Sequence, residues 1–154
     1  MQLPSWLVIG VVTVLVAMGS SVLRPKDVKW FNRLRRPRWL TFERLIPIIW
    51  TIVFICGAWS AYIVWEQTKS WQLMAFYLIV EITIVLYSPV MIWTRRINIG
   101  TLIGGIGFIL GLILALQVLQ VSGWAALLLV PYLLWSPIGT YTTWEISKLN
   151  PESA

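Results

Sequence analysis

The fold is decided by three consecutive stretches of 21 residues: LPSWLVIGVVTVLVAMGSSVL (3–23), RPKDVKWFNRLRRPRWLTFER (24–44) and LIPIIWTIVFICGAWSAYIVW (45–65). The two outer stretches carry no charge, whereas the middle one holds eight Lys and Arg residues. About 20 apolar residues are needed for a helix to cross the roughly 30 Å hydrocarbon layer of a membrane. We therefore predict two transmembrane helices joined by a basic loop at 24–44.

The rest of the chain continues this pattern. Hydrophobic residues make up 58% of the sequence and charged residues only 12%, which is far from the balance of a soluble domain. The uncharged run 97–144 is too long for one crossing, and we divide it where Gln117, Gln120, Ser122 and Gly123 cluster. The prediction is an all-α integral membrane bundle, a single domain over 1–154 with five transmembrane helices at 3–23, 45–65, 71–93, 98–119 and 124–146.

The distribution of Lys and Arg predicts the orientation. The connector contributes eight, Arg95 and Arg96 two, and Lys148 one, whereas the opposite side has only Lys69. Positive residues favour the cytoplasmic side, so we expect the N-terminus outside and the C-terminus in the cytoplasm. The first stretch lacks a basic start and exceeds the usual length of a signal-peptide core, so we expect it to be retained. The short termini and the charge bias favour a bacterial inner membrane.

Several classes of function are excluded by composition. The chain has no histidine, which removes His-ligated haem, histidine zinc sites and Ser/His/Asp catalysis, and we assign no catalytic residue and no metal site. The single cysteine, Cys56, cannot form an intrachain disulfide. Although the net charge is +6, no nucleic-acid motif accompanies it, and attraction to lipid headgroups explains the basic residues.

Tryptophan is the most conspicuous residue type, with eleven in 154 residues. Those near the ends of predicted spans fit the aromatic belt at the membrane interface. Trp50, Trp59 and Trp135 lie deeper, where they either pack between helices or line a cavity for a flat aromatic ligand. The belt candidates are Trp6, Trp65, Trp71, Trp93, Trp124 and Trp144.

Glu81 and a row of glycines are the other notable features. Glu81 falls near the middle of its span, so it must face protein or water, and structural hydrogen bonding, ligand contact and proton handling all remain open. Tyr77 and Ser88 share its helical face, and the expected partners are Thr140, Tyr141 or Thr143 of the last span. The glycines lie on one side of a helix and allow close packing, either within the monomer or in a homodimer. They are Gly100, Gly104, Gly107 and Gly111.

The order of several motifs resembles the TspO/MBR family, the tryptophan-rich sensory proteins and translocator proteins. The most specific motif is WFNRLRRPRW (30–39), which matches W-[YF]-x-x-L-x-[KR]-P-x-W. IPIIW (46–50), Ser88-Pro89 before Arg95-Arg96, and VPYLLW (130–135) follow in the family's order.

This resemblance implies a five-helix bundle whose first loop folds over a pocket, often in dimers, that binds porphyrins, haem, sterols or synthetic aromatic ligands. An enzymatic photo-oxidation of porphyrin is implied by resemblance alone, and no cofactor is obligatory. By matching position, the ligand-binding candidates are Trp39, Trp50, Phe54, Tyr87, Trp135 and Gly139, to which Glu81 is added as an acid beside the pocket.

The chain also departs from the family pattern on the polar side of the expected pocket. The family's cholesterol motif is not reproduced, because six residues separate Tyr141 from Lys148 where at most five are allowed. The substituted positions are Val80, Ile84 and Tyr87 in place of Gln, Asn and Trp, Thr143 in place of Asn, and Thr41-Phe42 in place of Pro-Pro.

Two functions of different class follow. In the first, the membrane-embedded protein binds and senses a hydrophobic planar ligand, a tetrapyrrole such as porphyrin or haem, whose propionates meet cations of the first loop. In the second, it is a small-molecule carrier or accessory membrane subunit in which Glu81 couples transport to protonation. The expected partners are the lipid bilayer, the hydrophobic ligand and, if the glycine row is a seam, a second copy of the chain.

Overall fold

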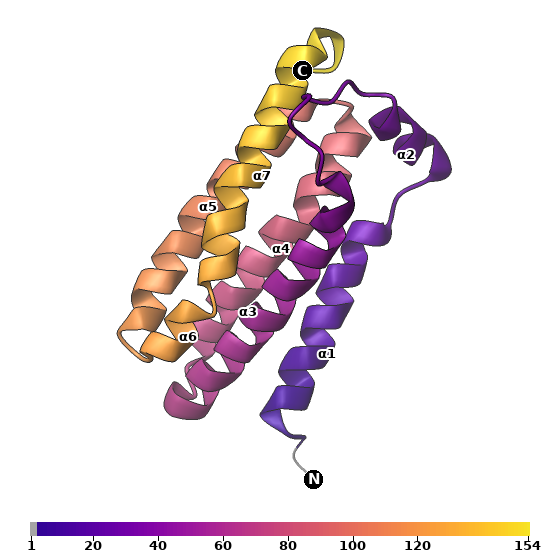
Figure 1. Cartoon of the computed structure of the whole chain (residues 1–154). Coiled ribbons are helices and arrows are strands. Elements are labelled where there is room, and N and C mark those ends of the chain that lie inside the picture. The colour runs from indigo at the N-terminus through magenta and orange to yellow at the C-terminus, as the bar shows by residue number, and fades with distance from the viewer. Residues whose placement is uncertain (1–2) are drawn as a thin grey trace.

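A computed structural model describes residues 3–154 as a bundle of helices, and the prediction of an all-α fold is confirmed (Figure 1). Four of its segments are long and apolar enough to cross a membrane, and the bent pair at the start supplies up to one more. The α-helices are α1 (Ser5–Met18), α2 (Pro25–Asn32), α3 (Ile46–Thr68), α4 (Trp71–Thr94), α5 (Ile97–Leu119), α6 (Gly123–Leu127) and α7 (Val130–Leu149). Short 3-10 turns occupy Gly19–Ser21 (η1), Glu43–Leu45 (η2) and Pro151–Ser153 (η3).

The first crossing is shorter than the predicted range 3–23. α1 continues only through the turn Gly19–Ser21, and the chain then bends by 73° into α2. Glycine and serine are weak helix formers, and Pro25 at the start of α2 forces the preceding Arg24 into an extended conformation. The bend directs α2 away from the bundle axis.

The last crossing, Gly123–Leu149, is one span in which the helix is interrupted, whereas the sequence predicted a regular helix over 124–146. α6 ends at Leu127 and α7 begins at Val130. Pro131 has no N–H to donate, and its ring would collide with the carbonyl of Leu127 in a continuous helix. The chain therefore changes direction at Leu128 and Leu129 before α7 begins.

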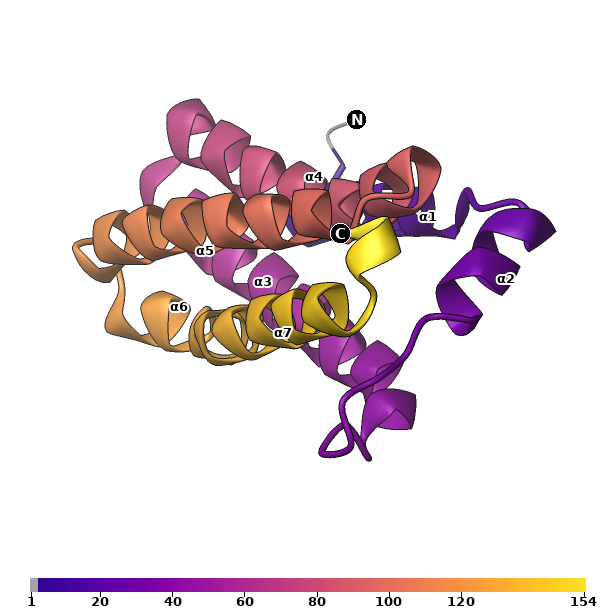
Figure 2. The ribbon, with the colours of Figure 1, turned by 90° about the horizontal axis from the view of Figure 1, so that it is seen from above.

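α5 is the most closely packed helix of the bundle and lies between α4 and α7 (Figure 2). Its glycine row faces these neighbours: a Cβ at Gly104 would overlap Thr140, and one at Gly111 would overlap the ring of Tyr132. At Gly100 a Cβ would lie 2.6 Å from the sulfur of Met91. The row therefore packs within the monomer, so it is not a seam for a homodimer.

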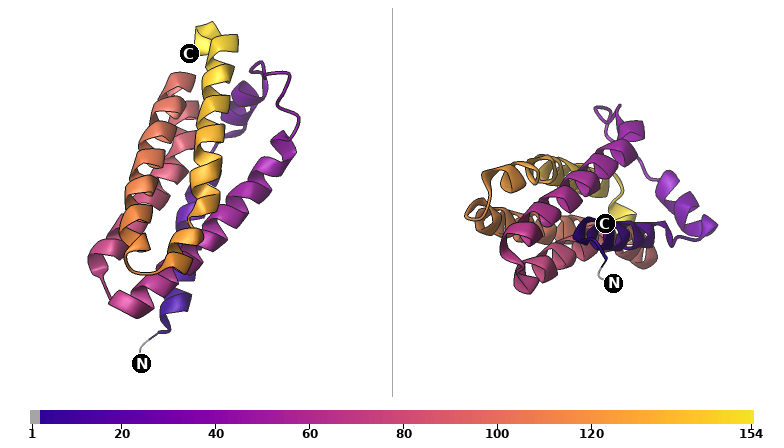
Figure 3. Two further views of the ribbon diagram at one scale, coloured as in Figure 1. Left: turned by 60° about the vertical axis from the view of Figure 1, so that its left-hand side comes forward. Right: turned by 90° about the horizontal axis from the view of Figure 1, so that it is seen from below.

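The basic end of the bundle, defined by residues 24–44, Arg95, Arg96 and Lys148, also contains the C-terminus, and the start of α1 lies at the opposite end (Figure 3). There the Asn150 side chain accepts a hydrogen bond from the backbone N–H of Arg35 at 2.9 Å and donates one to its carbonyl at 3.0 Å. This pair of bonds attaches the first loop to the end of α7.

Asp27 attaches α2 to α4. Its carboxylate is 1% exposed, accepts the backbone N–H of Arg24 at 3.1 Å, and pairs with the Arg95 guanidinium at 2.9 Å. Burial acts to raise the pKa of this carboxyl, but the hydrogen bonds from Arg24 and the charge of Arg95 outweigh it, so the pKa lies below its usual value. Trp30 lies under the same guanidinium, 5.0 Å from its central carbon.

Candidate ligand cavity

A cavity of about 340 Å³ lies inside the half of the bundle nearest the basic end. Its walls come from α3, α4, α5 and α7, and Phe31, Leu40 and Glu43 of the first loop close the top. This volume is at the lower end of the range of small-molecule sites, roughly 300–1,000 Å³. Other lining residues include Trp50, Ile84, Tyr87, Met91, Tyr132, Trp135, Ser136, Gly139, Thr140 and Thr143.

Two indole rings form one wall of this cavity. Trp50 of α3 and Trp135 of α7 are perpendicular, with ring centres 6.4 Å apart, and Phe54 lies 6.3 Å from Trp50 on the side away from the loop. Phe42 of the loop completes the row, edge-to-face with Trp135 at 6.3 Å between ring centres. Such rings offer flat apolar surface to a ligand and favourable edge-to-face contacts to one another.

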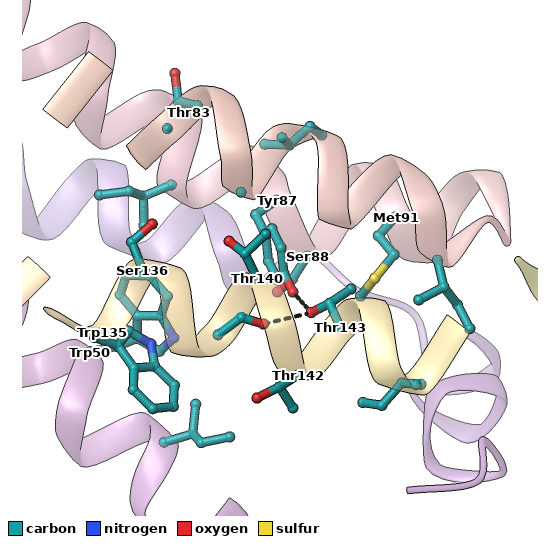
Figure 4. Close-up of a pocket in the computed structure, with 18 of the residues that line it drawn as sticks. Trp50, Thr83, Tyr87, Ser88, Met91, Trp135, Ser136, Thr140, Thr142 and Thr143 are labelled. Carbon is teal, nitrogen blue, oxygen red and sulfur yellow. Dashed lines mark hydrogen bonds between the residues drawn. The ribbon is translucent and has the colours of Figure 1, made fainter. Parts of the chain in front are cut away.

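The indole N–H of Trp135 is a buried donor without a partner among the described residues. The side chain is 7% exposed and lines the cavity, where Figure 4 shows it beside Trp50. A Cβ built on Gly139, one turn further along α7, would lie 3.5 Å from this nitrogen. A side chain there would make an ordinary van der Waals contact with the indole, so the glycine leaves a small space beside this nitrogen.

Hydroxyl groups line the part of the cavity nearer the basic end. The hydroxyls of Tyr87 and Thr143 are hydrogen bonded to each other and join α4 to α7, and Thr143 also donates to the Gly139 carbonyl at 3.1 Å (Figure 4). Ser136 and Thr140 lie on the same face of α7. Sequence reasoning did not assign these two residues to the site, although the spacing of 136, 140 and 143 places three hydroxyls on one helical face.

Arg36 stabilises the conformation of the loop that covers the cavity. Its guanidinium donates to the carbonyls of Phe31 and Leu34 at 2.8 and 2.7 Å, and lies 3.3 Å from the carboxylate of Glu43. All of these contacts are made within residues 24–44, so Arg36 stabilises the loop itself. Trp39 is 41% exposed outside the cavity lining and stacks on Tyr141 with ring centres 5.9 Å apart.

Comparison with known proteins agrees with this architecture. The sequence profile of the TspO/MBR family matches residues 6–149. The chain belongs to the TspO/MBR family. It is therefore a multi-pass integral membrane protein, and the resemblance inferred from its motifs is confirmed.

Curated TspO/MBR relatives match along most of the chain. The membrane protein YtaB of Bacillus subtilis is 28% identical over 94% of this chain and 95% of its own length. A tryptophan-rich sensory protein of Cereibacter sphaeroides is 26% identical over 90% and 89%, respectively. The tryptophan-rich protein TspO of Bacillus cereus is 29% identical over 85% and 87%.

Of the candidates taken from the TspO/MBR pattern, the structure brings Trp50, Tyr87, Trp135 and Gly139 to the cavity. Phe54 lies outside this lining but contacts Trp50. Glu81 borders a separate void of about 40 Å³ below the cavity.

The expected hydrogen-bond partners of Glu81 on the last span are wrong. Its carboxylate accepts from Thr13 of α1 at 3.2 Å. Tyr77, which shares its helical face, bonds instead to Ser60 of α3 at 2.6 Å. Three polar side chains of α4 thus bond to three different helices: Glu81 to α1, Tyr77 to α3 and Tyr87 to α7.

Proposed function

We propose that this TspO/MBR protein binds a hydrophobic planar ligand, a tetrapyrrole, in the cavity between Trp50, Tyr87 and Trp135. The unpartnered N–H of Trp135 carries the proposal. Buried donors in native proteins almost always have an acceptor, and leaving one unpaired costs about 1–3 kcal/mol. A ligand with an acceptor at its edge would restore that bond.

The walls support a flat, largely apolar guest. Trp50 and Trp135 present ring surfaces, and most of the lining surface is apolar, although Glu43 and several Ser, Thr and Tyr hydroxyls also line it. A small number of placed polar groups in an apolar cavity is the usual composition of a specific ligand site. Here those groups are the Trp135 N–H and the hydroxyls of α7.

The side chains available to ligate iron favour a metal-free porphyrin over haem as the ligand. Haem proteins hold the iron with His, Cys, Met or Tyr side chains. This chain has no histidine, the cavity lining has no cysteine, and its one methionine, Met91, is packed against α5. Of the two tyrosines in the lining, Tyr87 is hydrogen bonded to Thr143, and the hydroxyl of Tyr132 is packed against Gly107 of α5. A free porphyrin needs no such ligand, so the cavity can bind it by surface contact and hydrogen bonding alone.

Binding is expected to serve a sensory role, as the name of the Cereibacter relative, a tryptophan-rich sensory protein, indicates for that protein. The carrier alternative uses Glu81 as an intramembrane group that couples transport to protonation. Its carboxylate instead bonds to Thr13 and borders the small void, so the geometry supports the binding protein better.

Titration of the purified protein with protoporphyrin IX, followed by the porphyrin absorption band, tests the proposal. Trp135→Phe keeps a flat ring but removes the N–H, and we expect affinity to fall roughly two- to tenfold, the value of one hydrogen bond. Trp135→Ala also removes the surface, and we expect a loss of about thirtyfold, as for an aromatic anchor worth about 2 kcal/mol.

Trp124→Phe is the matched control, because Trp124 is exposed at the other end of the bundle and pairs with Trp59. It should leave affinity unchanged. Wild-type affinity in Trp135→Ala would rule out the cavity as the binding site.

A further inference from the structure

A second and larger opening lies on the other side of the cavity wall. It is a cleft of about 690 Å³ between α1, α3 and α4. The cleft and the cavity share a wall, since both are lined by Pro47, Trp50, Ile84, Tyr87 and Ser88. Only these side chains of α3 and α4 therefore separate the two spaces.

The cleft opens toward the outside of the bundle. Residues on its rim are strongly exposed, with Val14 at 59%, Met18 at 61% and Ile55 at 61%. These apolar side chains belong to membrane-crossing segments, so the surroundings of the opening are lipid rather than water. The cleft is consequently a hollow in the lipid-facing surface.

α1 forms one side of this hollow and is weakly attached. Of the residues of α1, all of which the structure describes, Thr13 alone is buried. Side-chain hydrogen bonds join Ser5 to Glu66 of α3 and Thr13 to Glu81 of α4. Ser5 lies outside the cleft, so the bond of Thr13 is the one side-chain hydrogen bond that ties the cleft-lining residues of α1 to another helix among the described residues.

The lining of the cleft is graded in polarity along the membrane normal. Ser20, Ser21 and Ser88 lie toward the basic end, whereas Gly10, Phe54 and Ala58 line the deeper, apolar part. A flat apolar molecule with an acidic or otherwise polar edge fits this gradient when its polar edge is at headgroup level. The basic connector begins at Arg24, three residues after Ser21, and places cations at the same level.

We propose that this cleft is a lateral entrance, open to the bilayer, through which a planar amphipathic ligand moves sideways from the lipid into the cavity. Trp50 and Tyr87 form the boundary that it crosses. This inference rests on the proposed function, because it assigns the route to the same cavity. It predicts that the cleft controls the rates of binding rather than the final affinity.

Two glycines allow a matched test. A Cβ on Gly10, which lines the cleft, meets nothing within 4 Å, and the same holds for Gly105, which lines a shallow groove between α5 and α7. Gly10→Phe should fill the cleft, whereas Gly105→Phe adds the same side chain elsewhere on the lipid-facing surface. Rates of protoporphyrin IX binding and release would be measured by stopped flow with each protein in lipid nanodiscs.

In Gly10→Phe we expect association and dissociation to slow together by about tenfold, equivalent to a barrier higher by about 1.4 kcal/mol, with an unchanged Kd. Gly105→Phe should keep both wild-type rates. Thr51→Phe provides a second obstruction from the α3 wall, at an exposed position, should Gly10→Phe fold poorly.

Wild-type rates in the folded cleft variants, or equal slowing in Gly105→Phe, would overturn the route. If in that case affinity still depends on Trp135, the cavity remains the binding site and only the route is wrong. Absence of porphyrin binding to the wild-type protein would instead overturn the proposed function and the route together.

Discussion

The α4–α5–α7 side of the bundle and the α1–α3 side differ in how closely their helices approach. On the first side, glycines let the backbone of α5 approach Thr140, Tyr132 and Met91. On the second, α1 buries a single residue and leaves a cleft. The cavity lies where the two sides meet. One part of its wall is therefore closely packed, and another part borders the cleft.

The largest expected effect comes from adding bulk on the close side. Gly111→Leu would force its side chain into the ring of Tyr132, and overpacking of this kind costs about 1–3 kcal/mol. The measurement is the free energy of unfolding in mixed detergent micelles.

Gly10→Leu is the control for this change, because the space around Gly10 is open. It should leave stability unchanged or raise it by up to about 1 kcal/mol, the helix-propensity gain over glycine. Equal destabilisation by both substitutions would remove the contrast between the two sides.

A smaller effect is expected at Ser60, which fixes the end of α3 away from the cavity. Its fully buried hydroxyl bonds to the Tyr77 hydroxyl at 2.6 Å and donates to the Ala125 carbonyl at 2.7 Å. Ser60→Ala leaves both partners unpaired and should lower the free energy of unfolding by about 1–2 kcal/mol. Ser60→Thr keeps the hydroxyl and tests whether the bonds, rather than volume, are responsible.

Thr13→Val should have a smaller effect still. It removes the 3.2 Å bond to Glu81 with little change of shape, and a hydrogen bond between membrane helices contributes about 0.6 kcal/mol on average. The same unfolding assay would measure it. A loss larger than that of Ser60→Ala would show that α1 is attached more firmly than its burial indicates.

The attachment of α2 should show no pH dependence near neutrality and loosen only in acid. The folded-state pKa of Asp27 is lowered, so its contribution is fully present above the unfolded value of about 3.9 and is lost as pH falls through the folded pKa. Protection of the α2 amides from hydrogen exchange, taken relative to the intrinsic exchange rate at each pH from pH 7 down to pH 3, should fall only below about pH 4. In Asp27→Asn the amides should exchange faster throughout and without this step.

Much of the fold was predictable because charged residues stand at the ends of the uncharged membrane segments. Lys69, Arg95 and Arg96 stand at the helix ends of α3, α4 and α5, and the predicted division near Gln120 falls between α5 and α6. The break before Pro131 was missed, since proline is tolerated inside some membrane helices, as Pro89 and Pro137 are here.

The site was predictable only in part. Resemblance selected Trp50, Tyr87, Trp135 and Gly139, which the structure brings to one cavity. The hydrogen-bond partner of Glu81 could not be predicted, because the hydropathy of a sequence does not reveal which helices lie side by side. The departures from the family pattern place Tyr87 and Thr143 together, so two substituted positions contact each other, which sequence spacing alone could not show.

The attachment of the first loop has a consequence for signalling across the membrane surface. This segment is fixed to α4 through Asp27 and to the end of α7 through Asn150, yet it continues directly into α3 through η2. Any outward displacement of α3 must therefore strain or rearrange the segment that carries most of the positive charge. If the proposed ligand displaced α3 on binding, the displacement would be transmitted through η2 to this positively charged surface.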